Sequence, residues 1–141
     1  MQRPLKAYLK QGRLADVLAL IQVLALDKSA HRSEAGIQEE LQGVPASASE
    51  WRELAREHPE FFRVRQRGDH VVSLTARHVL PREEDRPPQL PPEFVHKLME
   101  TAIELHDREL KRSEKWNYLI PAIVAAITSV IIVLVGAYLH R

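Results

Sequence analysis

Residues 119–139 read LIPAIVAAITSVIIVLVGAYL, a run of 21 positions without a charged side chain. At about 1.5 Å per residue, a helix of this length crosses the roughly 30 Å hydrocarbon core of a bilayer. Trp116 and Tyr118 before the run, and Tyr138 at its end, are aromatic residues of the kind that membrane–water interfaces favour. The stretch therefore predicts a single transmembrane helix over residues 117–139.

Two features inside this span bear on its packing. Pro121 is expected in the first turn of the helix, where its missing N–H costs little. Ala122 and Ala126 are small residues four apart, a spacing that lets two transmembrane helices approach closely. A homodimer through this helix is therefore one hypothesis. The residues that we assign to the transmembrane span as its ends, its proline and its small side chains are Leu119, Pro121, Ala122, Ala126, Gly136 and Leu139.

Basic residues are concentrated before the span and predict its orientation. Arg108, Lys111, Arg112 and Lys115 precede it, whereas only Arg141 follows it. Such an asymmetry predicts a cytoplasmic N-terminal domain. Because two residues follow the span, we also expect a tail-anchored protein that inserts after translation. A composition rich in leucine, arginine and alanine suggests that the membrane is a bacterial inner membrane. The alternative to a transmembrane helix is a hydrophobic helix that is buried in a complex.

Size and composition restrict what precedes the span. The chain has 141 residues, a formal charge of +1, 28% charged residues and no cysteine. One small domain of about 80 residues with a connector fits this length. The absence of cysteine excludes disulfides, thiolate metal sites and cysteine nucleophiles. The near-zero net charge gives no global field that would attract nucleic acid or acidic substrates.

The pattern of apolar residues predicts three helices and a hairpin before the connector. Residues 14–26 are apolar nearly all round and should form the central core helix. A second helix is expected over residues 33–42, and a capping box at residues 47–50 should start a third. Two strand-like runs, residues 61–65 and 70–78, flank a polar turn that contains glycine and aspartate. These elements predict a small α+β domain with a two-stranded wing.

This order of elements resembles the winged-helix superfamily of helix-turn-helix domains. The resemblance implies that the domain binds either DNA, through the third helix and the wing, or another protein. The expected organisation is an N-terminal segment (1–13), the winged-helix-like domain (14–80), a proline-rich charged linker (81–92), a juxtamembrane amphipathic helix (93–116) and the transmembrane helix (117–139).

The charged residues of the third helix and those of the wing favour different partners. Arg52 and Arg56 are the candidate recognition-helix residues, but four glutamates lie between residues 50 and 60. Like charge facing phosphate disfavours DNA binding. The wing has a candidate basic patch that would face nucleic acid or anionic lipid, or would simply be a solvated face that prevents strand aggregation. Its residues are Arg63, Arg65, Arg67 and Arg77.

The segment between the domain and the span has two parts. Residues 81–92 contain two Pro-Pro pairs among charged residues, which predicts a semi-rigid spacer or, alternatively, a ligand for a proline-binding groove. Residues 93–116 have one apolar stripe, which suggests a short coiled coil and hence a homodimer, or packing on the domain or on a partner.

No pattern in the chain indicates an active site. The seven histidines have no metal-ligand spacing, and the five glycines form no phosphate-binding loop. We therefore expect no enzyme, no cofactor and no metal. The leading hypothesis is a non-enzymatic, membrane-tethered module that binds an unknown protein partner. The alternative is a membrane-bound DNA-binding regulator.

Overall fold

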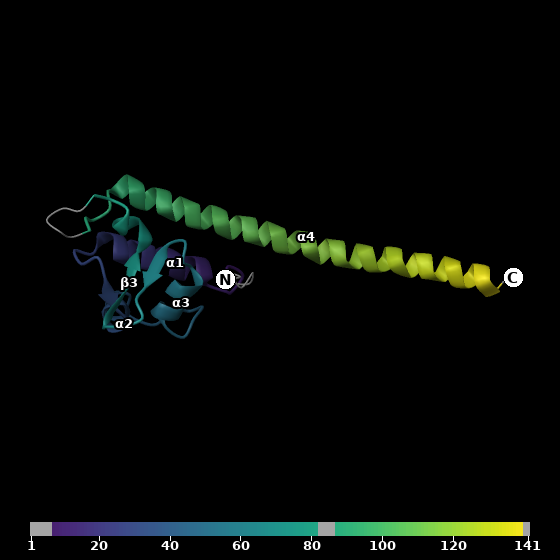
Figure 1. Ribbon diagram of the computed structural model, residues 1–141, viewed down its shortest axis with the longest axis horizontal. Helices are drawn as coiled ribbons and strands as arrows, with labels where there is room; N and C mark the ends of the chain where they lie inside the picture. Colours follow the sequence, from purple (N-terminus) through teal and green to yellow (C-terminus); the bar gives the residue numbers. More distant parts are fainter. Residues whose placement is uncertain (1–6, 82–86, 140–141) are drawn as a thin grey trace. The chain divides into compact units, whose positions relative to one another are not determined.

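The structure is a computed structural model that describes residues 7–81 and 87–139. The chain separates into two compact units, Met1–His106 and Asp107–Arg141. We refer to the first unit as the head and to the second as the tail. Figure 1 traces the chain and marks its elements.

The described residues form helices and a small sheet, followed by one long helix. The elements are α1 (Arg13–Leu26), β1 (Arg32–Ser33), α2 (Glu34–Glu40), α3 (Trp51–Glu57), β2 (Phe62–Val64), β3 (His70–Leu74), the 3-10 helix η1 (Thr75–His78) and α4 (Pro92–Leu139). Helix α4 begins in the head and continues through the tail. The predicted small α+β domain with a long apolar C-terminal helix is therefore confirmed.

The sheet has three strands in the order β1–β3–β2, and both pairings are antiparallel. Phe62 pairs with Leu74 and Val64 with Val72, so β2 and β3 form the expected hairpin. The sequence did not predict the third strand, β1, which extends this hairpin into a sheet and pairs Arg32 with Val72. A strand of two residues is too short to show alternation in the sequence.

The central strand, β3, is buried on both faces. Val71, Val72 and Leu74 are at most 1% exposed, although strict alternation would put Val71 on the opposite face from the other two. The hydroxyl of Ser73 lies 3.0 Å from Nε2 of His78, so η1 folds back over this second face. The turn into η1 also ends β3 at Leu74, earlier than the predicted end at residue 78.

Helix α1 supplies the centre of the core, as its sequence predicted. Leu20, Ile21 and Leu24 are fully buried. Around them lie further apolar side chains of α1, of the other helices, of the sheet and of the turn before β2, and together they remove the inner faces of these elements from water. They include Val17, Ala25, Ile37, Trp51, Leu54, Ala55, Phe61, Phe62, Val72 and Leu74.

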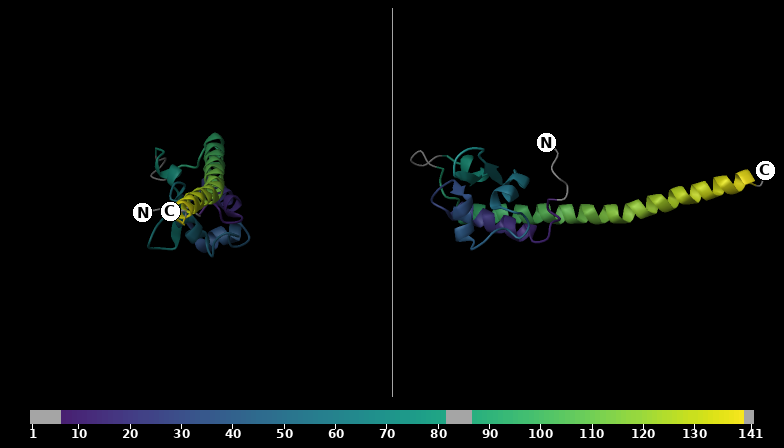
Figure 2. Two further views of the ribbon diagram at one scale, coloured as in Figure 1. Left: turned by 90° about the vertical axis from the view of Figure 1, so that its right-hand side faces the viewer. Right: turned by 90° about the horizontal axis from the view of Figure 1, so that it is seen from below.

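The first turns of α4 belong to this same core. Val95 and Ala102 are buried in the cluster that contains the α1 residues, and Leu98 and Leu105 pack against it. Figures 1 and 2 show these turns alongside α1. Of the alternatives for the apolar stripe, packing on the domain is the one observed. A coiled coil through these residues would have to uncover the core.

Part of the connector is packed as well, although we expected an unpacked spacer. Residues 82–86 lie outside the described residues. Leu90 is 4% exposed and joins the core cluster. The side-chain amide of Gln89 donates a hydrogen bond to the carbonyl of Leu26 at 2.8 Å. The end of the connector therefore rests on the head, because its one leucine fills a place in the core.

Candidate functional site

The apolar run of α4 is exposed along its length. Every large apolar side chain described between residues 119 and 138 is at least 51% exposed, and Tyr138 reaches 82%. The helix is long and apolar enough to cross a membrane, and none of its apolar window is buried. A core helix of a soluble protein would instead be covered by its own chain.

Pro121 lies in the interior of α4 and not in a first turn, which corrects its predicted place. The helix starts at Pro92 and runs without interruption to Leu139. A proline inside a helix has no N–H for the carbonyl four residues earlier, here Asn117, and typically costs about 3 kcal/mol. The helix predicted over residues 93–116 and the one predicted over residues 117–139 are thus one continuous helix, so the first turn of the apolar run is not the first turn of a helix.

The polar and small side chains of this run do not alter its apolar character. The hydroxyls of Thr128 and Ser129 donate to the carbonyls four residues earlier, at 2.8 and 2.9 Å. These hydroxyls therefore need no partner from outside the helix. Ala122 and Ala126 are exposed one turn apart, and self-association through them stays a prediction.

The four arginines of the predicted basic patch do not lie together on the surface. Arg63, Arg65 and Arg67 are exposed on the wing. Arg77 is 0% exposed and belongs to η1. Its assignment to the patch was wrong, because the chain turns into η1 after Leu74 and carries this side chain into the head.

Arg77 is surrounded by backbone carbonyls. Its Nη1 donates to three carbonyls at the end of α1 and just beyond it, at 3.0, 2.7 and 3.0 Å. Its Nε and Nη2 donate to Pro88 and Pro87 of the connector, at 2.9 and 3.1 Å. Burial lowers the pKa of the guanidinium, and the Asp27 carboxylate offsets this only in part. The three α1-side carbonyls belong to Leu24, Asp27 and Ser29.

The candidate recognition helix, α3, has an unusual cap. The backbone N–H groups of Trp51 and Arg52 both donate to the carboxylate of Glu34 in α2, at 2.8 Å each. This carboxylate therefore occupies the two amides that begin α3. The side chain of Arg52 is half-buried, whereas Arg56 is exposed. The predicted recognition pair thus differs in access to solvent.

The predicted capping box at residues 47–50 was wrong, because Ser47 has other partners. Its backbone N–H and its hydroxyl both donate to the carboxylate of Asp16, the former at 2.8 Å. Arg13 donates to the carbonyl of Ser47 at 2.8 Å and pairs with Glu57 at 2.6 Å. Arg13 and Asp16 are both buried. This network joins the start of α1 to both ends of the α3 region.

A second buried polar cluster follows α3. Nδ1 of the fully buried His58 lies 3.3 Å from Oε1 of Glu60, and the Tyr8 hydroxyl donates to the same oxygen. The rings of Tyr8 and His58 meet edge to face, with centroids 4.7 Å apart. Burial raises the pKa of Glu60, but the hydrogen bonds with His58 and Tyr8 outweigh it, so the net pKa is lowered. The cluster ties Tyr8, which precedes α1, to the end of α3.

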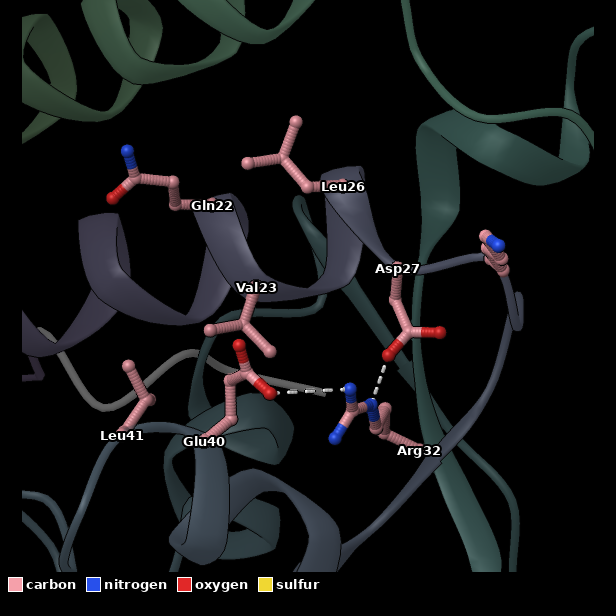
Figure 3. Close-up of a pocket in the computed structure, with 8 residues that line it drawn as sticks. Gln22, Val23, Leu26, Asp27, Arg32, Glu40 and Leu41 are labelled. Carbon is pink, nitrogen blue, oxygen red and sulfur yellow. Dashed lines mark hydrogen bonds and ion pairs between the residues drawn. The ribbon is translucent and has the colours of Figure 1, made fainter.

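An open groove of about 570 Å³ lies between α1, β1 and α2. Figure 3 shows Arg32 reaching toward both Asp27 and Glu40 across it. Arg32 pairs with Asp27, and its Nη2 lies 3.5 Å from Glu40. The lining thus combines the apolar side chains of Val23, Leu26 and Leu41 with charged groups that pair with Arg32. The lining residues are Gln22, Val23, Leu26, Asp27, Lys28, Arg32, Glu40 and Leu41.

The histidines and carboxylates of the described residues are dispersed. No three of these side chains in residues 7–81 and 87–139 are placed to hold a metal ion. Nε2 of His96 lies 3.3 Å from Glu100, one turn along the exposed side of α4.

Similarity to known proteins gives no further guide to these surfaces. The exposed apolar run and the polar surfaces of the head are therefore the features that bear on function. No protein-family model, curated protein or solved structure matches this chain.

Proposed function

We propose that this chain is a non-enzymatic, membrane-tethered protein-interaction module. The observation that carries the proposal is the exposed apolar run of residues 119–138 on a helix whose first turns belong to the core of the head. Removing apolar surface from water is worth roughly 25 cal/mol per Å². A bilayer would cover the whole circumference of this run, which the head leaves uncovered.

The proposed topology is a single pass with the head in the cytoplasm. Arg108, Lys111, Arg112 and Lys115 are exposed on α4 just before the apolar run. Basic residues next to a span favour the cytoplasmic side. A bacterial inner membrane fits the composition of the chain, and the lipid bilayer is then its first partner.

The head is proposed to be a winged-helix domain. Its elements follow the order helix, strand, helix, helix, strand, strand, and β1 lies at the sheet edge beside β3. This order supports the resemblance that the sequence suggested, with β2, β3 and their turn as the wing. In such a domain α3 would be the recognition helix.

A protein partner fits this head better than DNA does. The Glu34 carboxylate already accepts from the amides at the start of α3, where a phosphate would otherwise be favoured. Glu39 and Glu40 are exposed on α2 and would repel a nearby phosphate. The groove between α1 and α2 offers apolar side chains beside these charges.

The second candidate function is a membrane-bound DNA-binding regulator. Arg63, Arg65 and Arg67 are all exposed on the wing, which is the observation in its favour. Three phosphate contacts would give a binding constant that falls steeply with salt concentration. Arg56 is the exposed basic residue of α3 that could join them.

The anchor is tested by fractionating cells that express the full chain or a variant lacking residues 117–141. We expect the full chain to stay with membranes after alkaline extraction and the truncated chain to be soluble. A full chain released by alkali would contradict the anchor. The head is retained in both proteins, so a difference between them reports on the apolar run.

The partner is tested with the full chain in nanodiscs of neutral lipid, incubated with lysate or with labelled duplex DNA. We expect a defined protein that is captured by the native chain and lost with Glu39→Lys and Glu40→Lys together. The matched control replaces Arg63, Arg65 and Arg67 by glutamine. Salt-sensitive DNA retention that is lost only in this control would replace the protein-binding proposal with the DNA-binding one.

A further inference from the structure

Three cations in the tail have no role in the fold. Lys111, Arg112 and Lys115 are exposed and form no ion pair within the part of the chain that the structure describes. Arg108, one turn earlier, takes part in another interaction. The three cations are therefore fully available to a ligand.

These cations share one face of α4. At about 100° per residue, positions 111, 112 and 115 fall within an arc of roughly 100°. The carboxylates of the same stretch fall outside that arc, so the helix separates charges that nearly cancel in total. Those carboxylates belong to Asp107, Glu109 and Glu114.

The cationic face lies directly before the apolar run. Lys115 is four residues from Leu119, which is about 6 Å along a helix axis. Trp116 and Tyr118, between them, are 55% and 79% exposed. Aromatic rings of this kind settle at the depth of lipid headgroups. If residues 119–138 occupy the hydrocarbon core, Lys115 lies at the depth of the phosphates, and Arg112 and Lys111 lie about one helical turn further out, at the headgroup surface.

We propose that Lys111, Arg112 and Lys115 form a binding site for the phosphate groups of anionic phospholipids. This inference rests on the proposed function, because the apolar run must enter a bilayer to bring the site to the headgroups. Arg112 supplies a planar guanidinium that donates two parallel hydrogen bonds to phosphate oxygens. The two lysines supply compact charges on either side of it along the helix.

Lipid is favoured over a soluble anion by geometry and by charge. A headgroup is held beside this face at high local concentration by the anchor itself, whereas a soluble polyanion must arrive from solution. The flanking carboxylates weaken any attraction over long distances, since the stretch has little net charge. The cations therefore act on a phosphate at contact distance.

The test uses the full chain in vesicles of equal parts neutral phosphatidylcholine and anionic phosphatidylglycerol, with a trace of either lipid spin-labelled. Electron paramagnetic resonance then measures the enrichment of each lipid next to the protein. We expect anionic lipid to be enriched about fivefold, the effect of one basic residue at an anionic surface. The enrichment should fall in 1 M salt, which shortens the Debye length to about 3 Å.

The variant K111Q/R112Q/K115Q should show no lipid preference. The matched control R63Q/R65Q/R67Q removes the same charge from the wing and should keep the preference. Retained enrichment in the first variant, or its loss in the second, would overturn the inference. Vesicle flotation separates the two proposals: incorporation without lipid preference refutes this site alone, whereas failure of the native chain to incorporate refutes the anchor and the site together.

Discussion

The head and the tail differ in which side chains they expose to solvent. In the head, Leu20 and Leu24 are 0% exposed, and even the charged side chain of Arg77 is buried. In the tail, Val133 and Tyr138 are 70% and 82% exposed. The head thus buries a cation where carbonyls or a carboxylate face it, as at Arg77 and Arg13, whereas the tail exposes apolar groups without any cover. The proposed bilayer anchor accounts for this difference, because the tail would then meet lipid where the head meets water.

The single helix α4 contains both arrangements. Near its start, apolar residues such as Val95 and Ala102 follow one stripe, and that stripe is buried in the head. Beyond residue 119 the apolar residues surround the helix. A stripe needs one partner surface, whereas a fully apolar helix needs a partner all round. Four predictions either break this contrast or sharpen it.

The largest effect is expected from placing charges in the middle of the apolar run. Ile127→Lys together with Ile131→Lys should cost roughly 5 to 7 kcal/mol of membrane insertion, because each lysine at a helix centre costs about 2.5 to 3.5 kcal/mol. The measurement is the fraction of chain left in membranes after alkaline extraction. The control pair, Ile127→Leu with Ile131→Leu, should stay in the membrane. Equal retention of both pairs would argue that another protein covers the run.

The next effect concerns the buried cation of the head. Arg77→Met should lower the free energy of unfolding by roughly 3 to 5 kcal/mol, since five carbonyl hydrogen bonds lose their donor. Arg63→Met, on the exposed wing, should change it by less than about 0.5 kcal/mol. Urea unfolding of the full chain in neutral detergent, followed by near-ultraviolet circular dichroism, compares them. Equal midpoints would refute the structural role of Arg77.

A smaller effect is expected from the cap of α3. Glu34→Gln keeps the size of the side chain but removes the charge that faces two backbone N–H groups. The free energy of unfolding should fall by about 1 kcal/mol, as for a lost helix cap. Glu39→Gln, on the exposed side of α2, is the matched control and should be neutral. The same urea titration distinguishes the two variants.

The smallest effect is the pH dependence contributed by Glu60. Its folded pKa is lowered from 4.5, so its contribution to stability is complete above pH 4.5 and is lost as the pH falls through the folded pKa. The native chain should therefore lose its stability advantage over Glu60→Gln below pH 4.5. Unfolding midpoints at pH 7, 5 and 3 test this. An advantage that grows toward acid pH would show that the sign is wrong.

Much of the fold was predictable because its signals are local. Helices α1 and α3 lie where the apolar pattern put them, and the Ser33 hydroxyl caps α2 by accepting from the N–H of Gly36 at 3.0 Å. The two-residue strand β1 and the early end of β3 were missed, since both depend on strand pairing and on η1. The cap from Glu34 was missed because its partners lie 17 and 18 residues away.

By itself, the sequence determined that the chain has one long apolar helix, because an uncharged run of residues 119–139 is a property of neighbouring residues. It also determined the position of the core helix α1. Only the tertiary structure decided which arginines meet solvent. Arg63 and Arg77 have the same side chain and both follow α3, but the carbonyls that stabilise the buried Arg77 come from the end of α1, the loop after it and the connector. A buried charge is stabilised by groups distant in the chain, and no local pattern records them.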